Sequence, residues 1–570
     1  MNSLLLASAM IAGYFIAYHT YGRYLARKIF RLDPATICPS SALRDDIDFV
    51  PTKKEVLFGH HFTSIAGLGP ILGPAIAIIW GWVPAVIWVF FGAIFMGGVH
   101  DFGALVVSLR NQGRSIGDIA SDIVNRRVRN LFLLIIFFEL WIVIAIFALV
   151  IAILFEMYPQ SVIPVWSGIP IAVWLGYTVY KRQGNALGLG IVAVILMYVT
   201  VVIGAYVPIK LPKILGQSPI TAWMIILFLY SYVASTLPVQ VLLQPRDYIN
   251  AHQLLVALGL VFLGTIVSHP PIVAPAINLG AKGAPPVWPF IFVVIACGAI
   301  SGFHSLVSSG TSSKQCDSEN SSLFVGYGGM LMESVLSALV IVAVAGGIGL
   351  GLTDRSGERL MGVAAFSHHY ASWAAAKGLG SKISAFVSGS ANLIESYGIP
   401  PEITIAIMGV FLVSFAATTL DTATRIQRYV IGELATACSL KPFAGRHPAT
   451  FIAVLTAFVL AFYNGTGMGA LTLWPLFGSV NQLLAGLALL VVTIYLARQD
   501  APVVYTVIPM IFMIVMTGWA MAVNIGKFYA SANWLLFVIG LCVFVLEIWM
   551  VAESVIVFRH VYVAEKRQST

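Results

Sequence analysis

A few ionisable side chains lie inside long apolar runs of the chain, where they could carry a proton or contact a solute. A charged side chain at the centre of a membrane helix costs roughly 2.5–3.5 kcal/mol on insertion scales, so such residues are candidates for function. Histidine titrates near neutral pH and therefore suits proton transfer. The candidates for proton coupling are His100, Asp101 and Glu139, and His304 is a candidate for contact with a proton or a substrate.

The run that contains His304 also holds the densest group of hydroxyl side chains, in the sequence CGAISGFHSLVSSGTSSKQ. One or two Ser or Thr residues in a membrane helix commonly bond to carbonyls of their own helix or link two helices. Six or more, together with a histidine and two glycines, favour a polar pathway. The candidate substrate-binding or ion-binding residues in this run are His304, Ser305, Ser308, Ser309 and Thr311.

Glycine and proline interrupt another apolar run, GHHFTSIAGLGPILGPAIA. Pro70 and Pro74 lack backbone donors, and the glycines between them weaken the helix further. Unwound backbone deep in a membrane is tolerated only where it lines a cavity or is buried in protein, and it can hold a substrate or ion. The sequence therefore predicts a broken helix at 65–74, with Gly67 and Gly69 in the binding site.

A similar interruption is predicted at 233–240, in YSYVASTLPVQVLLQPRDY, with Ser235 and Thr236 as candidate binding residues. Five crossings separate the starts of the two interrupted runs. Because five is odd, a repeat of that length would sit inverted relative to the first copy, as in many secondary transporters.

Histidine offers one alternative to proton coupling, which is metal binding. The histidines at 60–61, 100 and 304 could converge on an ion, with His60 and His61 as candidate ligands, although no pair has the HxxxH spacing of a helical metal site. The spacing of Asp421 and Arg425 alternatively predicts an ion pair within one helix.

The composition shows which kind of element must position these residues. Of the 570 residues, 59% are hydrophobic and only 10% are charged, against about 25% charged in soluble domains. Such a chain must face lipid over most of its surface. The composition excludes a secreted disulfide protein, a cytosolic enzyme and a nucleic-acid binder, and it makes the lipid bilayer a partner.

Fifteen apolar runs are long enough to cross a membrane, since a crossing needs about 20 residues. They lie at 3–24, 57–80, 83–107, 131–155, 163–180, 186–206, 220–244, 252–269, 288–310, 323–350, 401–423, 448–464, 469–496, 502–523 and 533–557. A sixteenth, weaker run at 383–397 is rich in Gly and Ser and is expected to be a re-entrant or surface helix. Three parts follow: 1–56, with the first helix and a loop; 57–430, the transporter core; and 431–570, a four-helix extension.

Basic residues indicate the orientation of these crossings. With the N-terminus outside and alternating crossings, 24 of the 32 Lys and Arg residues fall in the inner connections. Inner loops of membrane proteins carry such an excess. We therefore expect a periplasmic N-terminus and a cytoplasmic C-terminus.

Five segments resemble the carbon starvation protein A family, and the resemblance runs from about residue 5 to beyond 490. The segments are HFTSIAGLGPILGPAIA, GGVHDFGALVVSLRNQGRSIGDIA, SGFHSLVSSGTSSKQ, FAATTLDTATRIQRYVIGE and GSVNQLLAGLALL. The resemblance implies a bacterial inner-membrane transporter linked to peptide uptake under carbon starvation, with close relatives that take up pyruvate with protons. It also implies an inverted five-plus-five, LeuT-like core, whose two unwound helices would correspond to 65–74 and 233–240. In that fold Ser308, Ser309 and Thr311 would lie where sodium-coupled members hold an ion.

The sequence thus predicts an all-α polytopic membrane protein of about 15 transmembrane helices that acts as a secondary active transporter by alternating access. The coupling ion is expected to be H+, with Na+ as the alternative, and no other cofactor is expected. Peptides and small carboxylates such as pyruvate both present a carboxylate and remain open as substrates. An ion or solute channel is the alternative function. An enzyme is not expected, because neither HExxH nor GxSxG is present.

Overall fold

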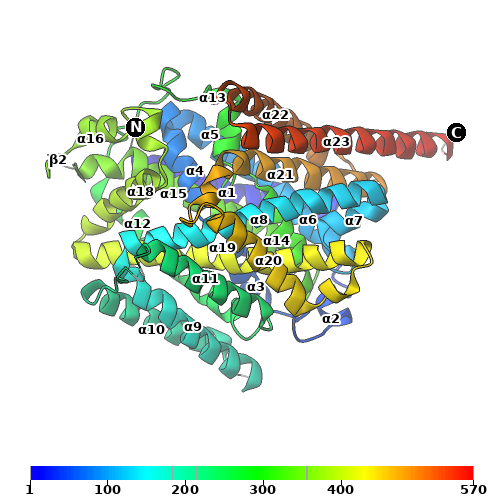
Figure 1. The fold of residues 1–570 in the computed structure, drawn as a ribbon, viewed down its shortest axis with the longest axis horizontal. Helices are drawn as coiled ribbons and strands as arrows, with labels where there is room; N and C mark the ends of the chain where they lie inside the picture. Colours follow the sequence, from blue (N-terminus) through cyan, green and yellow to red (C-terminus); the bar gives the residue numbers. More distant parts are fainter. Residues whose placement is uncertain (1, 183, 214–215, 355–356, 569–570) are drawn as a thin grey trace.

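Helices form almost all of the computed structural model, which describes residues 2–182, 184–213, 216–354 and 357–568 (Figure 1). The first half of the chain forms α1 (Ser3–Ala17), α2 (Pro39–Ala42), α3 (Lys54–Ile65), α4 (Gly69–Ala77), α5 (Trp82–Gly92), α6 (Gly98–Arg110), α7 (Ile116–Ile123), α8 (Arg126–Met157), α9 (Val162–Gly176), α10 (Ala186–Tyr206), α11 (Pro219–Thr236) and α12 (Leu243–Ser268). The second half forms α13 (Val287–Val294), α14 (Gly302–Gly310), α15 (Gly328–Ala345), α16 (Gly362–His369), α17 (Trp373–Ala376), α18 (Leu379–Glu395), α19 (Pro401–Ala437), α20 (Arg446–Phe462), α21 (Trp474–Ala497), α22 (Val504–Ala530) and α23 (Trp534–Gln568). Two short strands, β1 (Leu352–Thr353) and β2 (Arg359–Leu360), pair antiparallel.

Many of these helices are long and apolar enough to cross a membrane. Within the described residues, 12 helices meet that test, and the bent pair α3–α4 makes a thirteenth crossing if it is one span. The remaining two predicted runs are 288–310, which is divided between α13 and α14, and 448–464, which forms the shorter α20. The prediction of an all-α polytopic membrane protein is therefore confirmed.

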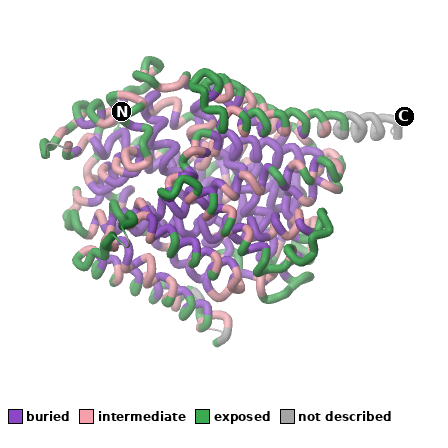
Figure 2. The backbone as a smooth tube through the Cα atoms, in the orientation of Figure 1, coloured by how far each residue is buried: buried purple, intermediate pink, exposed green. Residues whose placement is uncertain are grey.

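The outer helices expose apolar side chains at helical spacing, as lipid-facing helices do. On α10, Leu187, Ile191 and Ile195 are 62%, 52% and 58% exposed. Buried residues fill the middle of the bundle, whereas α9, α10, α22 and α23 lie at its edges with much of their length exposed (Figure 2).

Capping side chains determine where several helices begin. The side chains of Asn125 and Asn185 accept hydrogen bonds from the first free backbone amides of α8 and α10. Ser218 does the same for α11, and Pro219, in the first turn, has no amide that needs a partner. These polar residues mark where the helices start although the flanking runs are apolar.

The first predicted break is confirmed. Residues 66–68 leave the helical conformation between α3 and α4, and the two helices meet at an angle of 47°. Pro70 stands in the first turn of α4 and cannot donate a hydrogen bond back across the gap. The hydroxyl of Ser337 on α15 donates to the carbonyl of Pro70 at 3.0 Å, so this backbone group is satisfied inside the bundle.

The second predicted break, at 233–240, is wrong. Helix α11 is continuous to Thr236, and residues 237–242 form the turn that leads into α12. Pro238 therefore ends a helix instead of interrupting one, and the five-crossing repeat inferred from this position loses its support.

A second break does exist, two runs further along the chain, in residues 295–301 between α13 and α14. Side chains from other helices satisfy its backbone. The indole of Trp88 donates to the carbonyl of Ile295 at 2.9 Å, and just past the break the amide of Phe303, in the first turn of α14, donates to Asn481 Oδ1 at 2.9 Å. Unwound backbone that is buried and hydrogen-bonded in this way can persist at membrane depth.

The weak run at 383–397 forms part of α18, which packs against α4, α12, α15 and α19. Its residues Ile383, Ala385 and Phe386 are 2% exposed or less. It is therefore an interior helix, and the expectation of a surface helix is wrong.

Candidate functional site

The two broken helices meet at their breaks. A Cβ atom built on Gly69 would overlap the side chain of Cys297, and one built on Gly73 would lie 2.6 Å from the carbonyl oxygen of Val294. Only glycine allows this approach between the start of α4 and the segment at 295–301. Glycines predicted as helix breakers thus also set the distance between the two unwound segments.

Replacing Gly73 with alanine is expected to lower the free energy of unfolding by about 1–3 kcal/mol, the usual effect of overpacking a close-packed interior. The new methyl group would press on backbone, which yields less easily than the end of a side chain. Thermal unfolding of the purified protein measures the effect. The matched control is Gly259→Ala, because a Cβ at Gly259 meets nothing within 4 Å. Equal losses in both variants would show that the close approach is unimportant.

Both breaks line a cavity of about 820 Å³. Gly67, Leu68 and Gly69 contribute from the first break, and Ala296 and Cys297 from the second. The predicted binding residues Gly67 and Gly69 therefore lie in the cavity wall. Most of the remaining wall is apolar and comes from α4, α8, α13 and α21. Such walls exclude water and leave recognition to a few polar groups.

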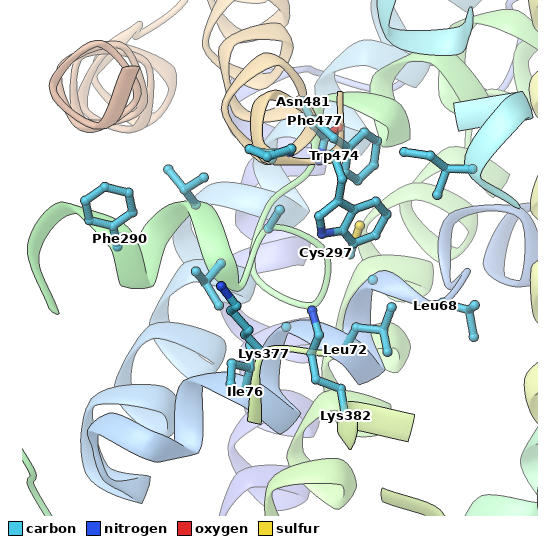
Figure 3. A pocket seen from close by; sticks show the side chains of 18 of the residues that line it. Leu68, Leu72, Ile76, Phe290, Cys297, Lys377, Lys382, Trp474, Phe477 and Asn481 are labelled. Carbon is cyan, nitrogen blue, oxygen red and sulfur yellow. The ribbon is translucent and has the colours of Figure 1, made fainter. Parts of the chain in front are cut away.

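The polar groups of the cavity include three lysines but, among the described lining residues, no Asp or Glu. Figure 3 shows the side chains of Lys377 and Lys382 on the same side of the cavity, with Trp474 facing Lys382. Lys382 is 9% exposed, and its ammonium lies 5.7 Å from the centre of the Trp474 ring. The third lysine, Lys527, lies 4.5 Å from the ring centre of Phe290. A positive cavity without carboxylates suits an anionic group on the ligand.

Asp101 lies between two histidines in the interior. Its carboxylate oxygens are 2.7 Å from His100 Nδ1 and 2.9 Å from His304 Nδ1, and His304 Nε2 is 3.2 Å from Glu333. All four side chains are fully buried. The structure thus brings His100, Asp101 and His304 together, whereas Glu139 on α8 has no hydrogen-bond partner among the described residues. The role of His100, Asp101 and Glu139 in proton coupling stays a prediction.

A second buried network joins five polar side chains from four helices. His60 Nδ1 on α3 lies 2.6 Å from Asp247 on α12, and Arg246 contacts both Asp247 and Asp421 of α19. Tyr230 of α11 donates to Asp421 at 2.9 Å. Sequence reasoning missed Asp247, which falls between two predicted runs where polar residues are ordinary, and Tyr230, which is an ordinary residue of an apolar run.

The predicted pairing of Asp421 with Arg425 is wrong. Asp421 pairs with Arg246, while Arg425 lies 2.8 Å from Asp48 in the loop before α3, as does Arg428 at 2.7 Å. Burial opposes ionisation of Asp48, but the two guanidinium groups outweigh it and lower its pKa to about 2. The loop is therefore fixed to α19 by an ionised carboxylate.

Two of the predicted hydroxyl groups of α14, those of Ser305 and Ser309, bond mainly within their own helix. Ser305 donates to Gly302 of its own helix, and Ser309 donates to Ser305 and accepts from the amide of Ile116. Their side chains are satisfied, as isolated hydroxyls in membrane helices commonly are.

The other two hydroxyls of this helix remain of interest. Ser308 is buried without a hydrogen-bond partner among the described residues. Thr311 lies 3.3 Å from His60 Nε2 and donates to its own helix at Val307. Thr311 therefore connects the end of α14 to the network of His60.

Ser235 and Thr236 lie outside the cavity. Each donates to a carbonyl three residues back in α11, at Tyr232 and Val233 respectively. Neither is among the described residues that line the cavity. The prediction that they bind substrate depended on a break at 233–240 that does not exist, so it loses the observation on which it rested.

Metal-ligating side chains come together in one place within the described residues. Cys297, His304 and Glu333 present ligand atoms that all lie within 4.8 Å of one another. The predicted candidates His60 and His61 do not join them. His60 bonds to Asp247, and His61 Nδ1 lies 2.8 Å from the hydroxyl of Ser312.

Comparison with known proteins identifies relatives over nearly the whole chain. Residues 2–520 match the family model described as "Carbon starvation protein CstA". A Campylobacter jejuni "Peptide transporter CstA" is 32% identical, over 91% of this chain and 79% of the relative. The Escherichia coli "Peptide transporter CstA" is 30% identical, over 92% and 81%. The Escherichia coli "Pyruvate/proton symporter BtsT" is also 30% identical, over 94% and 84%.

Proposed function

The chain belongs to the carbon starvation protein CstA family, and we propose that it imports peptides or small carboxylates such as pyruvate together with protons. Relatives that match most of this chain are named as a peptide transporter and as a pyruvate/proton symporter. These names support a secondary active transporter over a channel. The protein resides in the bacterial inner membrane, with its N-terminus in the periplasm and its C-terminus in the cytoplasm, as its basic residues indicate.

One observation carries this proposal, namely that two abutting helix breaks line a cationic cavity. Unwound segments offer free amides and carbonyls to a solute, and movement of one segment against the other can open the cavity on alternate sides. Lys377, Lys382 and Lys527 provide positive charge for the carboxylate that peptides and pyruvate share. Seven crossings separate the starts of the two interrupted runs, an odd number, so an inverted arrangement of the two broken helices is the expectation.

We propose the network of His60 and Asp247 as the carrier of the coupling proton, because this network joins both broken helices. His60 belongs to α3, and Thr311 follows α14. With His60 neutral and Nδ1–H donated to Asp247, Nε2 accepts from the Thr311 hydroxyl. With His60 protonated, Nε2–H donates to Thr311, whose own hydrogen then serves Val307. One proton thus changes the link between the two broken helices.

Uptake into liposomes that contain the purified protein tests the function. Labelled pyruvate and a labelled dipeptide are supplied outside, with an inward proton gradient. We expect at least one of them to accumulate above its outside concentration and to leave again when a protonophore dissipates the gradient. Rapid equilibration without accumulation would favour a channel, and no movement of either solute would contradict the proposal.

A further inference from the structure

The side chains of Cys297, His304 and Glu333 meet beside the cavity although they come from three separate elements. Cys297 stands in the unwound segment 295–301, His304 lies in the first turn of α14, and Glu333 projects from α15. One Sγ, one imidazole nitrogen and one carboxylate oxygen lie within 4.8 Å of one another. This donor set is typical of zinc, which binds Cys, His and carboxylate side chains with tetrahedral geometry.

The Glu333 side chain is a second observation that points to a ligand at this place. Its side chain is 0% exposed, and neither carboxylate oxygen makes a hydrogen bond with a described residue. His304 Nε2 lies 3.2 Å from one oxygen, but it too has no aligned hydrogen bond. Buried polar atoms that face each other without bonding are costly unless something satisfies them. A cation between them would satisfy both.

Asp101 orients the His304 ring for binding a metal ion. Its Oδ2 atom lies 2.9 Å from His304 Nδ1, a distance at which Nδ1–H donates to the carboxylate and leaves Nε2 to face Glu333 at 3.2 Å. His100 holds the other Asp101 oxygen at 2.7 Å. Histidines that bind metals commonly donate their second ring nitrogen to a carboxylate in this manner, which fixes the ring and increases its basicity.

An ion in the cavity can reach the three side chains through Cys297, because Cys297 is part of the cavity wall and is only partly buried. Its thiol points to the hydroxyl of Ser301 at 3.4 Å, a weak contact that it can exchange for a metal. We propose that Cys297, His304 and Glu333 bind a thiophilic divalent cation, best matched by Zn²⁺, which enters from the cavity and leaves one coordination position facing it.

Binding needs a small local closure and the loss of one proton. Zinc lies about 2.3 Å from sulfur and about 2.0–2.1 Å from nitrogen, so tetrahedral ligand atoms are roughly 3.2–3.6 Å apart. Side-chain movements of about 1 Å achieve this. The thiol proton leaves to solvent when the thiolate–metal bond forms. The ion then ties the unwound segment to α14 and α15, so it would arrest any cycle that moves these elements apart.

Cobalt binding tests the site without any transport measurement. Purified full-length protein is titrated with Co²⁺, whose thiolate complexes absorb by charge transfer in the near ultraviolet. We expect a charge-transfer band that saturates at one ion per chain and that Zn²⁺ displaces. Cys297→Ser should abolish the band, and Asp101→Asn should weaken Co²⁺ binding by about 10- to 100-fold through loss of the carboxylate behind His304.

Two other cysteines provide matched controls. Cys438 is exposed and Cys316 is buried elsewhere, so Cys438→Ser and Cys316→Ser should retain the band. Glu333→Gln keeps the shape of the side chain but removes its charge, and it should weaken Co²⁺ binding by at least tenfold. The proposal is wrong if the wild-type protein shows no saturable band, or if Cys297→Ser keeps the wild-type band.

A transport measurement tests whether the bound ion arrests the transport cycle. This experiment rests on the proposed function. Zn²⁺ should inhibit uptake by the wild-type protein and by Cys438→Ser, and should inhibit Cys297→Ser at least tenfold less strongly. A protein that shows the Cys297-dependent band but moves no solute would refute the transport proposal alone. A protein that transports but lacks the band would refute the metal site alone.

Discussion

Replacing Lys382 with methionine is expected to reduce uptake of the carboxylate substrate by about 30-fold or more while the protein stays folded. Lys382 is the buried lysine of the cavity, and its ammonium makes no hydrogen bond or ion pair with a described residue. Truncating one partner of a buried, hydrogen-bonded charge pair costs about 2–5 kcal/mol, which corresponds to about 30- to 5,000-fold in binding. Initial uptake rates over a range of substrate concentrations measure the loss.

Stability should change in the opposite direction from transport. A buried ammonium without an anion is destabilising, so methionine of similar length should leave the melting temperature unchanged or raise it. Lys377→Met is the matched control, because Lys377 lines the same cavity but is exposed. We expect a smaller loss of uptake there. Equal effects of the two substitutions, or a folded Lys382→Met protein with normal uptake, would show that Lys382 does not hold the carboxylate.

Replacing Asp247 with asparagine is expected to abolish proton-driven accumulation. With one proton per solute, a gradient of one pH unit supports roughly tenfold accumulation, since one unit equals about 1.36 kcal/mol. Asparagine removes the carboxylate that lies 2.6 Å from His60 Nδ1, so the ratio of inside to outside substrate should fall to about one. Exchange of labelled for unlabelled substrate needs no net proton movement and should persist.

Breaking a buried pair can also unfold a protein, at a cost of about 3–5 kcal/mol. A second variant, His60→Asn, therefore separates the loss of proton coupling from unfolding. His60→Asn leaves the contacts of Arg246 with Asp247 and Asp421 in place, and we expect it to lose accumulation while retaining exchange. Full accumulation by a folded His60→Asn protein would exclude this network as the proton carrier.

The two helix breaks show how far local sequence can predict such a fold. The break at 66–68 was predictable, because prolines and glycines inside a long apolar run prevent helical hydrogen bonding wherever that run lies. The same type of signal at Pro238 marks a turn between two helices. Proline ends a helix equally well at the membrane edge and at its centre, so the sequence does not distinguish the two. The true second break, at 295–301, depends on Trp88, which bonds to the carbonyl of Ile295, and on Asn481, which bonds to the amide of Phe303 just beyond the break; both side chains come from other helices.

Ion pairs show the same limit of prediction from local sequence. The spacing of Asp421 and Arg425 predicted a pair within one helix, yet Arg246 and Asp48 are their partners. Separation along the chain can predict only an ion pair within one helix. A buried charge instead pairs with whichever opposite charge helix packing brings close to it. The cavity lysines carried no signal in the sequence, because loops and helix ends often contain isolated basic residues.

The sequence by itself determined that this chain is a polytopic membrane protein, where most of its apolar helices lie, which family it resembles and where one helix is interrupted. These properties follow from composition and from patterns within about 20 residues, which hydrophobicity and backbone chemistry control directly. Only the tertiary structure decided which break faces which, that Lys382 lies in a cavity without carboxylates, and that Cys297, His304 and Glu333 meet. Those facts depend on how helices pack against one another, and the distance between two packed side chains is not encoded in their separation along the chain.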